Sequence, residues 1–173
     1  MKRYYAIILV ALIACNDPKL AKSDAVSSTF DLPAYFAEEV KHLEAKKPLV
    51  QKSVWINKKE ESKTVRISNW KKELSIFTDA DINKKAWAGE FQKSVTDTSE
   101  QYTTANEKIP VKQVIIYKRG SVVTGINIFI RNGNYLYTST DTLSYYPNKL
   151  YQIKKMQHIR FMNSKSYQIL GKL

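Results

Sequence analysis

Cysteine and glycine are scarce in this chain of 173 residues, which contains one cysteine, Cys15, and five glycines. A single cysteine cannot form an internal disulfide, so we expect hydrophobic burial and hydrogen bonding to hold the fold together. The glycines are isolated from one another, and none belongs to a glycine-rich phosphate-binding loop. These absences exclude a disulfide-framed scaffold and the sequence fingerprints of nucleotide binding.

The residue patterns of common catalytic sites are also missing. His42 and His158 are the only histidines, and neither belongs to an HxH or HExxH metal-ligand pattern. No GxSxG motif is present, and acidic pairs such as Glu38 and Glu39 fit helix faces or turns. We therefore predict no catalytic residue, no metal, no cofactor and no enzymatic activity. A hydrolase whose site is assembled only in space is the alternative.

The apolar run at the N-terminus, Ala6 to Ala14, is too short to cross a membrane. Nine residues rise about 14 Å as a helix, whereas the hydrocarbon core of a bilayer is about 30 Å thick. Lys2 and Arg3 precede the run, and Cys15 follows it. This order predicts a cleaved signal peptide, with a buried strand as the alternative.

The sequence Leu12-Ile13-Ala14-Cys15 resembles the lipobox of bacterial lipoprotein signal peptides. The resemblance implies that Cys15 receives a diacylglyceryl group, becomes the new N-terminus and anchors the chain to a membrane of the cell envelope. Asn16, in place of an aspartate after the cysteine, favours the outer membrane over the inner one. We predict a signal peptide at 1–14, the lipidated cysteine and a flexible polar tether at 15–28, and a single domain at 29–173.

Basic residues outnumber acidic ones, 28 to 16, for a net charge of +12. Nucleic acid would be a common partner for such a charge, but an exported, tethered domain rarely meets it. Anionic lipid, lipopolysaccharide or an acidic glycan fits the predicted location better. Because the lysines are scattered along the chain, an ordinary solvated surface is the alternative explanation.

Helical periodicity appears in two segments. Leu32, Phe36, Val40 and Leu43 recur at helical spacing behind Asp31, a candidate N-cap. Trp70, Leu74 and Phe77 predict a second, shorter helix that ends between residues 79 and 83. Both helices should bury these stripes against a sheet.

The remaining chain predicts strands, and its many tyrosines favour antiparallel pairing. We expect strands at 49–57, 62–68, 87–95, 101–104, 111–119, 121–131, 135–139, 143–146, 150–161 and 166–173. We expect strand 87–95 to bury one face and strands 111–119 and 121–131 to be covered on both faces. We also expect a type I′ turn at Asn132-Gly133. The predicted fold is α+β, with an N-terminal helix and a second short helix packed on a mainly antiparallel β-sheet.

Three segments, FDLPAYFAEEV, DINKKAW and LSYYPNKLYQIKKMQHIRF, resemble an uncharacterised family of small Bacteroidota lipoproteins. The resemblance implies the same kind of fold and a membrane location. That family has no assigned activity, so the resemblance implies no catalytic residue.

A cluster of aromatic residues is the strongest candidate for a ligand or partner surface. It comprises Tyr135, Tyr137, Tyr145, Tyr146 and Tyr151, with Arg131 nearby. Alternation along a strand places Tyr145 and Tyr146 on opposite faces, so one groove cannot hold all five. The first functional hypothesis is a non-catalytic envelope lipoprotein that binds a protein partner or scaffolds a complex. The second is a lipid- or glycan-binding module that uses one sheet face.

Overall fold

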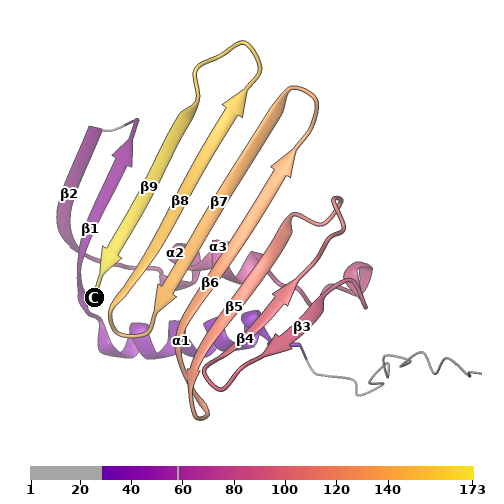
Figure 1. Cartoon of the computed structure of the whole chain (residues 1–173). Helices are drawn as coiled ribbons and strands as arrows, with labels where there is room; N and C mark the ends of the chain where they lie inside the picture. Colours follow the sequence, from indigo (N-terminus) through magenta and orange to yellow (C-terminus); the bar gives the residue numbers. More distant parts are fainter. Residues whose placement is uncertain (1–28, 58) are drawn as a thin grey trace, which may run out of the picture.

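The computed structural model describes residues 29–57 and 59–173, which form one antiparallel sheet with helices on one side. The predicted signal peptide, Cys15 and the tether lie outside the described residues. The sheet has nine strands in the order β2-β1-β9-β8-β7-β6-β5-β4-β3 (Figure 1). The C-terminal strand β9 therefore lies beside β1, which holds the two ends of the domain together. The predicted α+β class and mainly antiparallel sheet are confirmed.

The strands follow the chain in hairpins on both sides of a helical crossover. Their bounds are β1 Leu49–Ile56, β2 Lys59–Arg66, β3 Gln92–Val95, β4 Ser99–Thr103, β5 Val111–Arg119, β6 Val122–Gly133, β7 Tyr137–Tyr146, β8 Leu150–Ile159 and β9 Lys165–Lys172. Between β2 and β3 the chain forms α2 (Trp70–Glu73), α3 (Ser75–Asp79) and the 3₁₀ helix η1 (Lys85–Trp87). This crossover carries the chain from one edge of the sheet to the other.

The long helix α1, Leu32–Lys46, begins and ends where its sequence predicts. The side chain of Asp31 accepts the backbone N–H of Ala34 at 2.8 Å, and a proline occupies the first turn. Lys47 closes the helix in the left-handed conformation, and its N–H donates to the carbonyl of Leu43. The predicted second helix is present in two pieces, because the chain bends at Leu74 between α2 and α3.

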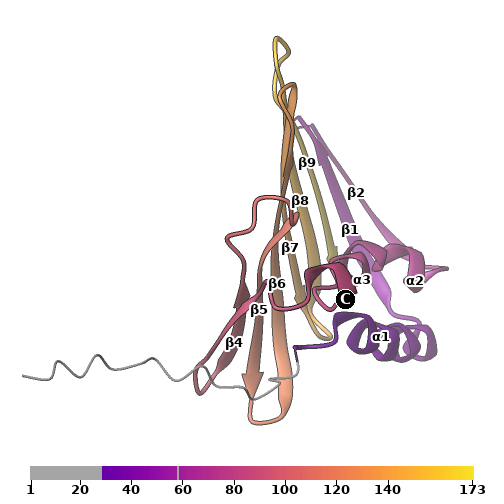
Figure 2. The ribbon, with the colours of Figure 1, turned by 90° about the vertical axis from the view of Figure 1, so that its right-hand side faces the viewer.

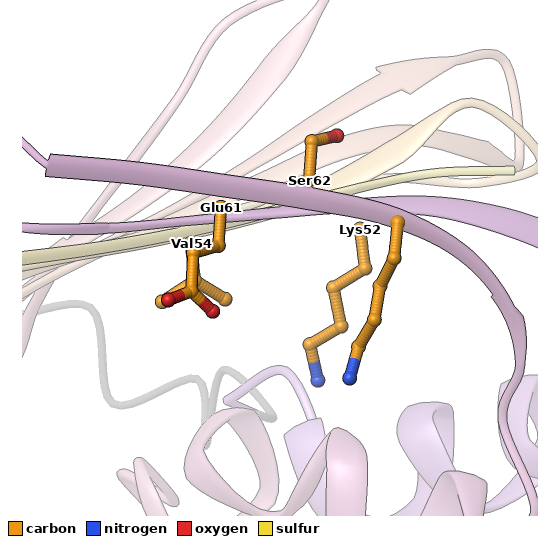
Figure 3. Close-up of a pocket in the computed structure, with 5 residues that line it drawn as sticks. Lys52, Val54, Glu61 and Ser62 are labelled. Atoms are coloured by element: carbon orange, nitrogen blue, oxygen red, sulfur yellow. The ribbon is translucent and has the colours of Figure 1, made fainter.

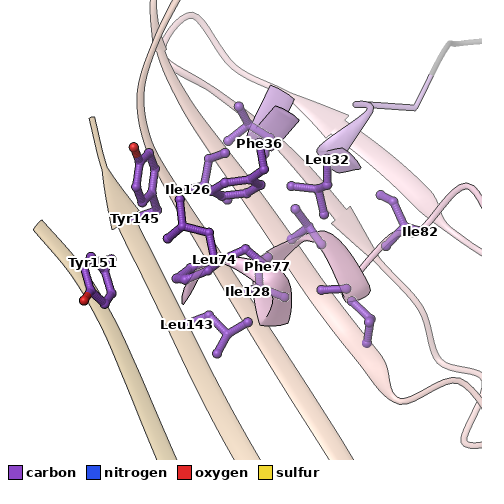
Figure 4. Close-up of a cluster of buried hydrophobic side chains, with 14 of the residues drawn as sticks. Leu32, Phe36, Leu74, Phe77, Ile82, Ile126, Ile128, Leu143, Tyr145 and Tyr151 are labelled. Carbon is purple, nitrogen blue, oxygen red and sulfur yellow. The ribbon is translucent and has the colours of Figure 1, made fainter. Parts of the chain in front are cut away.

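All three α-helices lie on the same side of the sheet, at one end of it (Figures 1 and 2). Phe36, Phe77 and Tyr145 form an aromatic cluster between the helices and the sheet, with ring centroids 5.1–6.0 Å apart. Aliphatic side chains of α1, β6 and β7 fill the space around them, together with Leu74 between α2 and α3 (Figure 4). Each of these fully buried side chains contributes about 1.5–3 kcal/mol to folding. Among the described residues, the core cluster extends from Phe30 to Leu173, so segment 29–173 includes all the side chains of this cluster.

Four predictions about the sheet are wrong. The two strands expected at 135–139 and 143–146 are a single strand, β7. Trp87 belongs to η1, and β3 is a four-residue edge strand with no buried residue, because no helix packs beneath it. The central strands β5 and β6 are covered on one face only; Phe129, on the other face, is 37% exposed. Gly133 still pairs with Thr138 in the ladder, so the β6–β7 turn lies further on, where Asn134 accepts the N–H groups of Leu136 and Tyr137.

Candidate functional site

The sheet is longer than the helices that cover it, which leaves part of its helix side open. Strands β6 to β9 extend well beyond α1, α2 and α3 (Figures 1 and 2). Side chains at the covered end, such as Leu143 and Ile128, are fully buried. The same cross-strand row continues from Leu143 toward β1, and its next residues are only half-buried. They are Ile153, Ile169 and Val54. An apolar row therefore leaves the core and reaches solvent beneath β1.

Two adjoining hollows lie along the hairpin of β1 and β2 at this place, with volumes of about 560 and 400 Å³. They share Val54 and Glu61, and we call them together the β1–β2 groove. Lys52, Val54 and Glu61 point from the strands toward the helices, whereas Ser62 points away (Figure 3). The groove is lined by Lys52, Val54, Ile56, Asn57, Lys59, Glu61, Ser62 and Lys63.

The inner end of the groove is closed by an ion pair to helix α2. The ammonium of Lys52 lies 2.6 Å from Oε1 of Glu73, and the hydroxyl of Tyr151 donates to the same oxygen at 2.5 Å. The ring of Tyr151 fits because Gly171 faces it across the strands: a Cβ on Gly171 would collide with that ring. Burial, followed by the hydrogen bond to Glu73, raises the pKa of Tyr151 well above its ordinary value of 10. Tyr151 therefore stays a neutral hydrogen-bond donor at physiological pH.

The outer part of the groove has apolar and basic side chains side by side. Val54 pairs with Glu61 across the hairpin, Lys52 with Lys63, and Ile56 with Lys59. Within residues 29–57 and 59–173, no carboxylate lies within salt-bridge distance of Lys59 or Lys63. The groove thus offers an apolar strip, two unpaired ammonium groups and one carboxylate, that of Glu61. Lys63 lies opposite Lys52, whose charge is already balanced by Glu73, and Glu61 is the next residue of β2 on the same face.

A second polar cluster lies on the helix side of β7 and β8. Asp141 is 5% exposed and accepts the Ser139 hydroxyl at 2.7 Å and the ammonium of Lys155 at 3.1 Å. Gln157 donates to the hydroxyl of Tyr137 at 3.3 Å. Every side chain of this cluster forms a hydrogen bond with another member, which leaves little hydrogen-bonding capacity for an external ligand.

The tyrosines predicted to form a surface are not brought together. Tyr145 and Tyr151 are fully buried in the core, and Tyr145 donates to Glu39 of α1 at 2.5 Å. Tyr137 lies on the helix side, whereas Tyr146 lies on the helix-free side, where its ring packs over Gly125. Tyr135 is in the β6–β7 turn and is 80% exposed. Arg131 is exposed on the helix-free side of β6, so the six residues form no single groove.

The two histidines lie apart from each other, and neither forms an ion pair among the described residues. His42 Nε2 is 3.2 Å from Oδ1 of Asn148, and His158 Nδ1 is 3.1 Å from the hydroxyl of Ser164. Among the described residues, no three histidine, cysteine, aspartate or glutamate side chains are grouped closely enough to hold a metal ion.

The β1–β2 groove was missed by the sequence predictions because its residues look like an ordinary polar hairpin. Lys59, Glu61 and Lys63 alternate with other polar residues, and alternation alone does not say which face meets the helices. The excess of lysine over acid in this hairpin was the one available signal. This excess of lysine indicates a binding surface only once β1 is known to pair with β9, because that pairing places the apolar row beside the lysines.

Comparisons with protein-family models, with curated proteins and with solved structures find no match for this chain. In the part of the chain that the structure describes, no helix combines the length and apolar character needed to cross a bilayer.

Proposed function

We propose that this protein is a lipid-anchored protein of the bacterial cell envelope that binds a ligand without transforming it. The predicted lipobox at Cys15 supports the location. The ligand carries an apolar chain and an anionic group, the chemistry of a fatty acid or an anionic phospholipid. The main support for this proposal is the groove beneath β1 and β2. There, a row of apolar side chains extends from the core to the surface beside unpaired lysines.

The arrangement of the groove sets the orientation of such a ligand. The anionic group lies beside Lys63, whose ammonium has no carboxylate within salt-bridge distance among the described residues, and away from Glu61, which would repel it. The apolar chain then lies against Val54 and Ile56 and against Ile169 of the neighbouring strand. Apolar burial supplies most of the affinity, and the lysines supply orientation and selectivity.

Fluorescence of a dansyl-labelled fatty acid tests the proposal on residues 29–173. We expect its emission to rise and shift to the blue on addition of the protein. Val54→Trp fills the groove and Lys63→Glu reverses a charge in it, and each should weaken binding about tenfold or more. Lys154→Glu is the matched control, since Lys154 is exposed on the helix-free side of β8.

Unchanged emission with the wild-type protein rejects the binding function. If Lys63→Glu and Lys154→Glu weaken fatty-acid binding equally, the effect is due to net charge. That result also rejects the groove as the binding site. Thermal unfolding of each variant confirms that it is folded.

Scaffolding through a protein partner is the second candidate. It is favoured by the filled core between helices and sheet and by exposed apolar residues elsewhere on the surface. Native pull-down of the membrane-bound protein, followed by identification of proteins and lipids in the eluate, separates the two candidates.

A further inference from the structure

Exposed apolar side chains gather at the far end of the sheet, where the β6–β7 and β8–β9 loops meet. Phe161 is 90% exposed, Tyr135 80%, Leu136 57% and Met162 56%. We call these four residues the apolar tip. The two loops form the end most distant from α1, and they project as narrow hairpins (Figures 1 and 2). Four large apolar side chains at one projecting end differ from the single exposed residues that any protein surface carries.

The two loops are held together, so the tip is one surface. The backbone N–H of Arg160 donates to the carbonyl of Leu136 at 2.9 Å. The guanidinium of Arg160 lies 4.5 Å from the ring centroid of Tyr135 and 5.0 Å from that of Phe161. One arginine therefore orders two aromatic rings from different loops.

The backbone at the tip presents Phe161 to solvent. Phe161 has a φ of 67°, in the left-handed region that favours glycine. A bulky residue there is strained and gains no burial in the free protein. This combination points to burial in a complex.

The charge around the tip is of one sign. Residues 131–138 and 157–166 contain Arg131, Arg160 and Lys165 together with His158, and no acidic residue. Residues 108–173 hold eleven lysines and arginines and a single acid, Asp141, whose carboxylate is paired with Lys155. The tip thus combines apolar and aromatic side chains with cations that carry long aliphatic stems.

We propose that the apolar tip docks into the surface of an anionic phospholipid bilayer. Phe161, Leu136 and Met162 enter the boundary between headgroups and acyl chains, and Tyr135 lies at headgroup level. Arg160 and Lys165 extend to the lipid phosphates while their stems remain in the apolar layer. The exposed aromatic and aliphatic side chains and the surrounding cations together match the surface of an anionic bilayer. Docking of the tip does not involve the β1–β2 groove.

Flotation with vesicles tests docking on residues 29–173, which lack Cys15 and the predicted signal peptide. We expect the protein to float with vesicles of phosphatidylglycerol and phosphatidylcholine and much less with phosphatidylcholine alone. The double variant Tyr135→Ser/Phe161→Ser should reduce partitioning about tenfold or more. The matched control is Val95→Ser/Val122→Ser, which removes two side chains of 62% and 64% exposure outside the tip.

A site-specific probe locates the contact. Segment 29–173 has no cysteine, so Phe161→Cys and Val122→Cys can each carry a single environment-sensitive nitrobenzoxadiazole dye. The dye at 161 should brighten and shift to the blue on anionic vesicles, and the dye at 122 should not.

Equal behaviour of tip and control variants overturns the proposal. So does absence of flotation accompanied by tip-dependent retention of an envelope protein, which would make the tip a protein-docking surface. If docking fails but the dansyl-labelled fatty acid still binds, the groove proposal stands alone.

Discussion

Glu100 illustrates how single side chains connect distant parts of this fold. Its Oε1 accepts the ammonium of Lys118 at 2.5 Å, and its Oε2 accepts the hydroxyl of Tyr102 at 2.7 Å. Tyr102 in turn accepts the backbone N–H of Phe30 at 3.1 Å. The network therefore ties the start of the domain to β4 and β5. Burial alone would raise the pKa of Glu100, but the bonds from Lys118 and Tyr102 outweigh it and lower the pKa from 4.5.

Replacing Glu100 by Gln should destabilise the domain by about 1–3 kcal/mol at neutral pH, because Lys118 and Tyr102 lose an ionised acceptor. A carboxylate with a lowered folded-state pKa stabilises the protein above its unfolded pKa. That contribution disappears as pH falls from about 4.5 through the lower folded-state pKa, so wild type and Glu100→Gln should converge there.

Thermal unfolding between pH 3 and pH 7 measures this convergence. Glu107→Gln is the control, because Glu107 is exposed and has no salt bridge among the described residues. A constant difference between wild type and Glu100→Gln across this range would contradict the assignment.

At the scale of elements, the helix ends and the edge strands follow local chemistry. Strand β2 lies at one edge of the sheet, and five of its eight residues are charged. Exposed charges on an edge strand oppose pairing with a second chain. Helix α1 is held at its start by Asp31, and its C-terminal Lys46 donates to Asn148 in the β7–β8 turn at 3.0 Å. These contacts position α1 over the covered end of the sheet.

Asp31→Ala should cost about 1 kcal/mol of stability, because the N–H of Ala34 loses its acceptor. Chemical denaturation in urea should show a lower midpoint with an unchanged slope. Asp97→Ala, which also removes one negative charge at an exposed position, should have a much smaller effect. Equal effects of the two substitutions would mean that charge, and not the cap, is responsible.

At the scale of the whole molecule, the start of the described chain and the apolar tip lie toward opposite ends of the sheet. The domain begins at the end of the sheet occupied by α1, and the tip is at the other end (Figure 1). A strand of ten residues is about 33 Å long. The thirteen residues 16–28 can reach about 45 Å when fully extended. An anchored domain can therefore lie along a membrane with its tip in the same surface.

Cys15→Ser should abolish incorporation of a clickable fatty acid in cells and release the protein from the membrane fraction or leave it as an uncleaved precursor. The wild type should carry the label. Phe161→Ser is the control, because a tip variant should keep the lipid and the membrane attachment. Label on Cys15→Ser, or none on the wild type, would disprove the lipidation prediction.

How much of the fold could be predicted depended on the range of the interactions. The stripe of Leu32, Phe36 and Leu43 and the cap at Asp31 act within one helix, and those predictions are confirmed. Two predictions of burial were wrong: a buried face for residues 87–95 and burial of both faces of β5 and β6. Burial of a strand depends on elements that are distant in the chain and pack against it.

The sequence by itself determined the class of the fold, most element boundaries, the charge and the predicted lipobox, because these depend on local spacing and composition. Only the tertiary structure decided which residues act together. Pairing of β1 with β9 creates the β1–β2 groove, and contact between two loops separated by more than twenty residues creates the apolar tip. The tertiary structure also decided the exposure of the tyrosines, because the helices cover Tyr145 and Tyr151 and leave Tyr135 in an exposed turn.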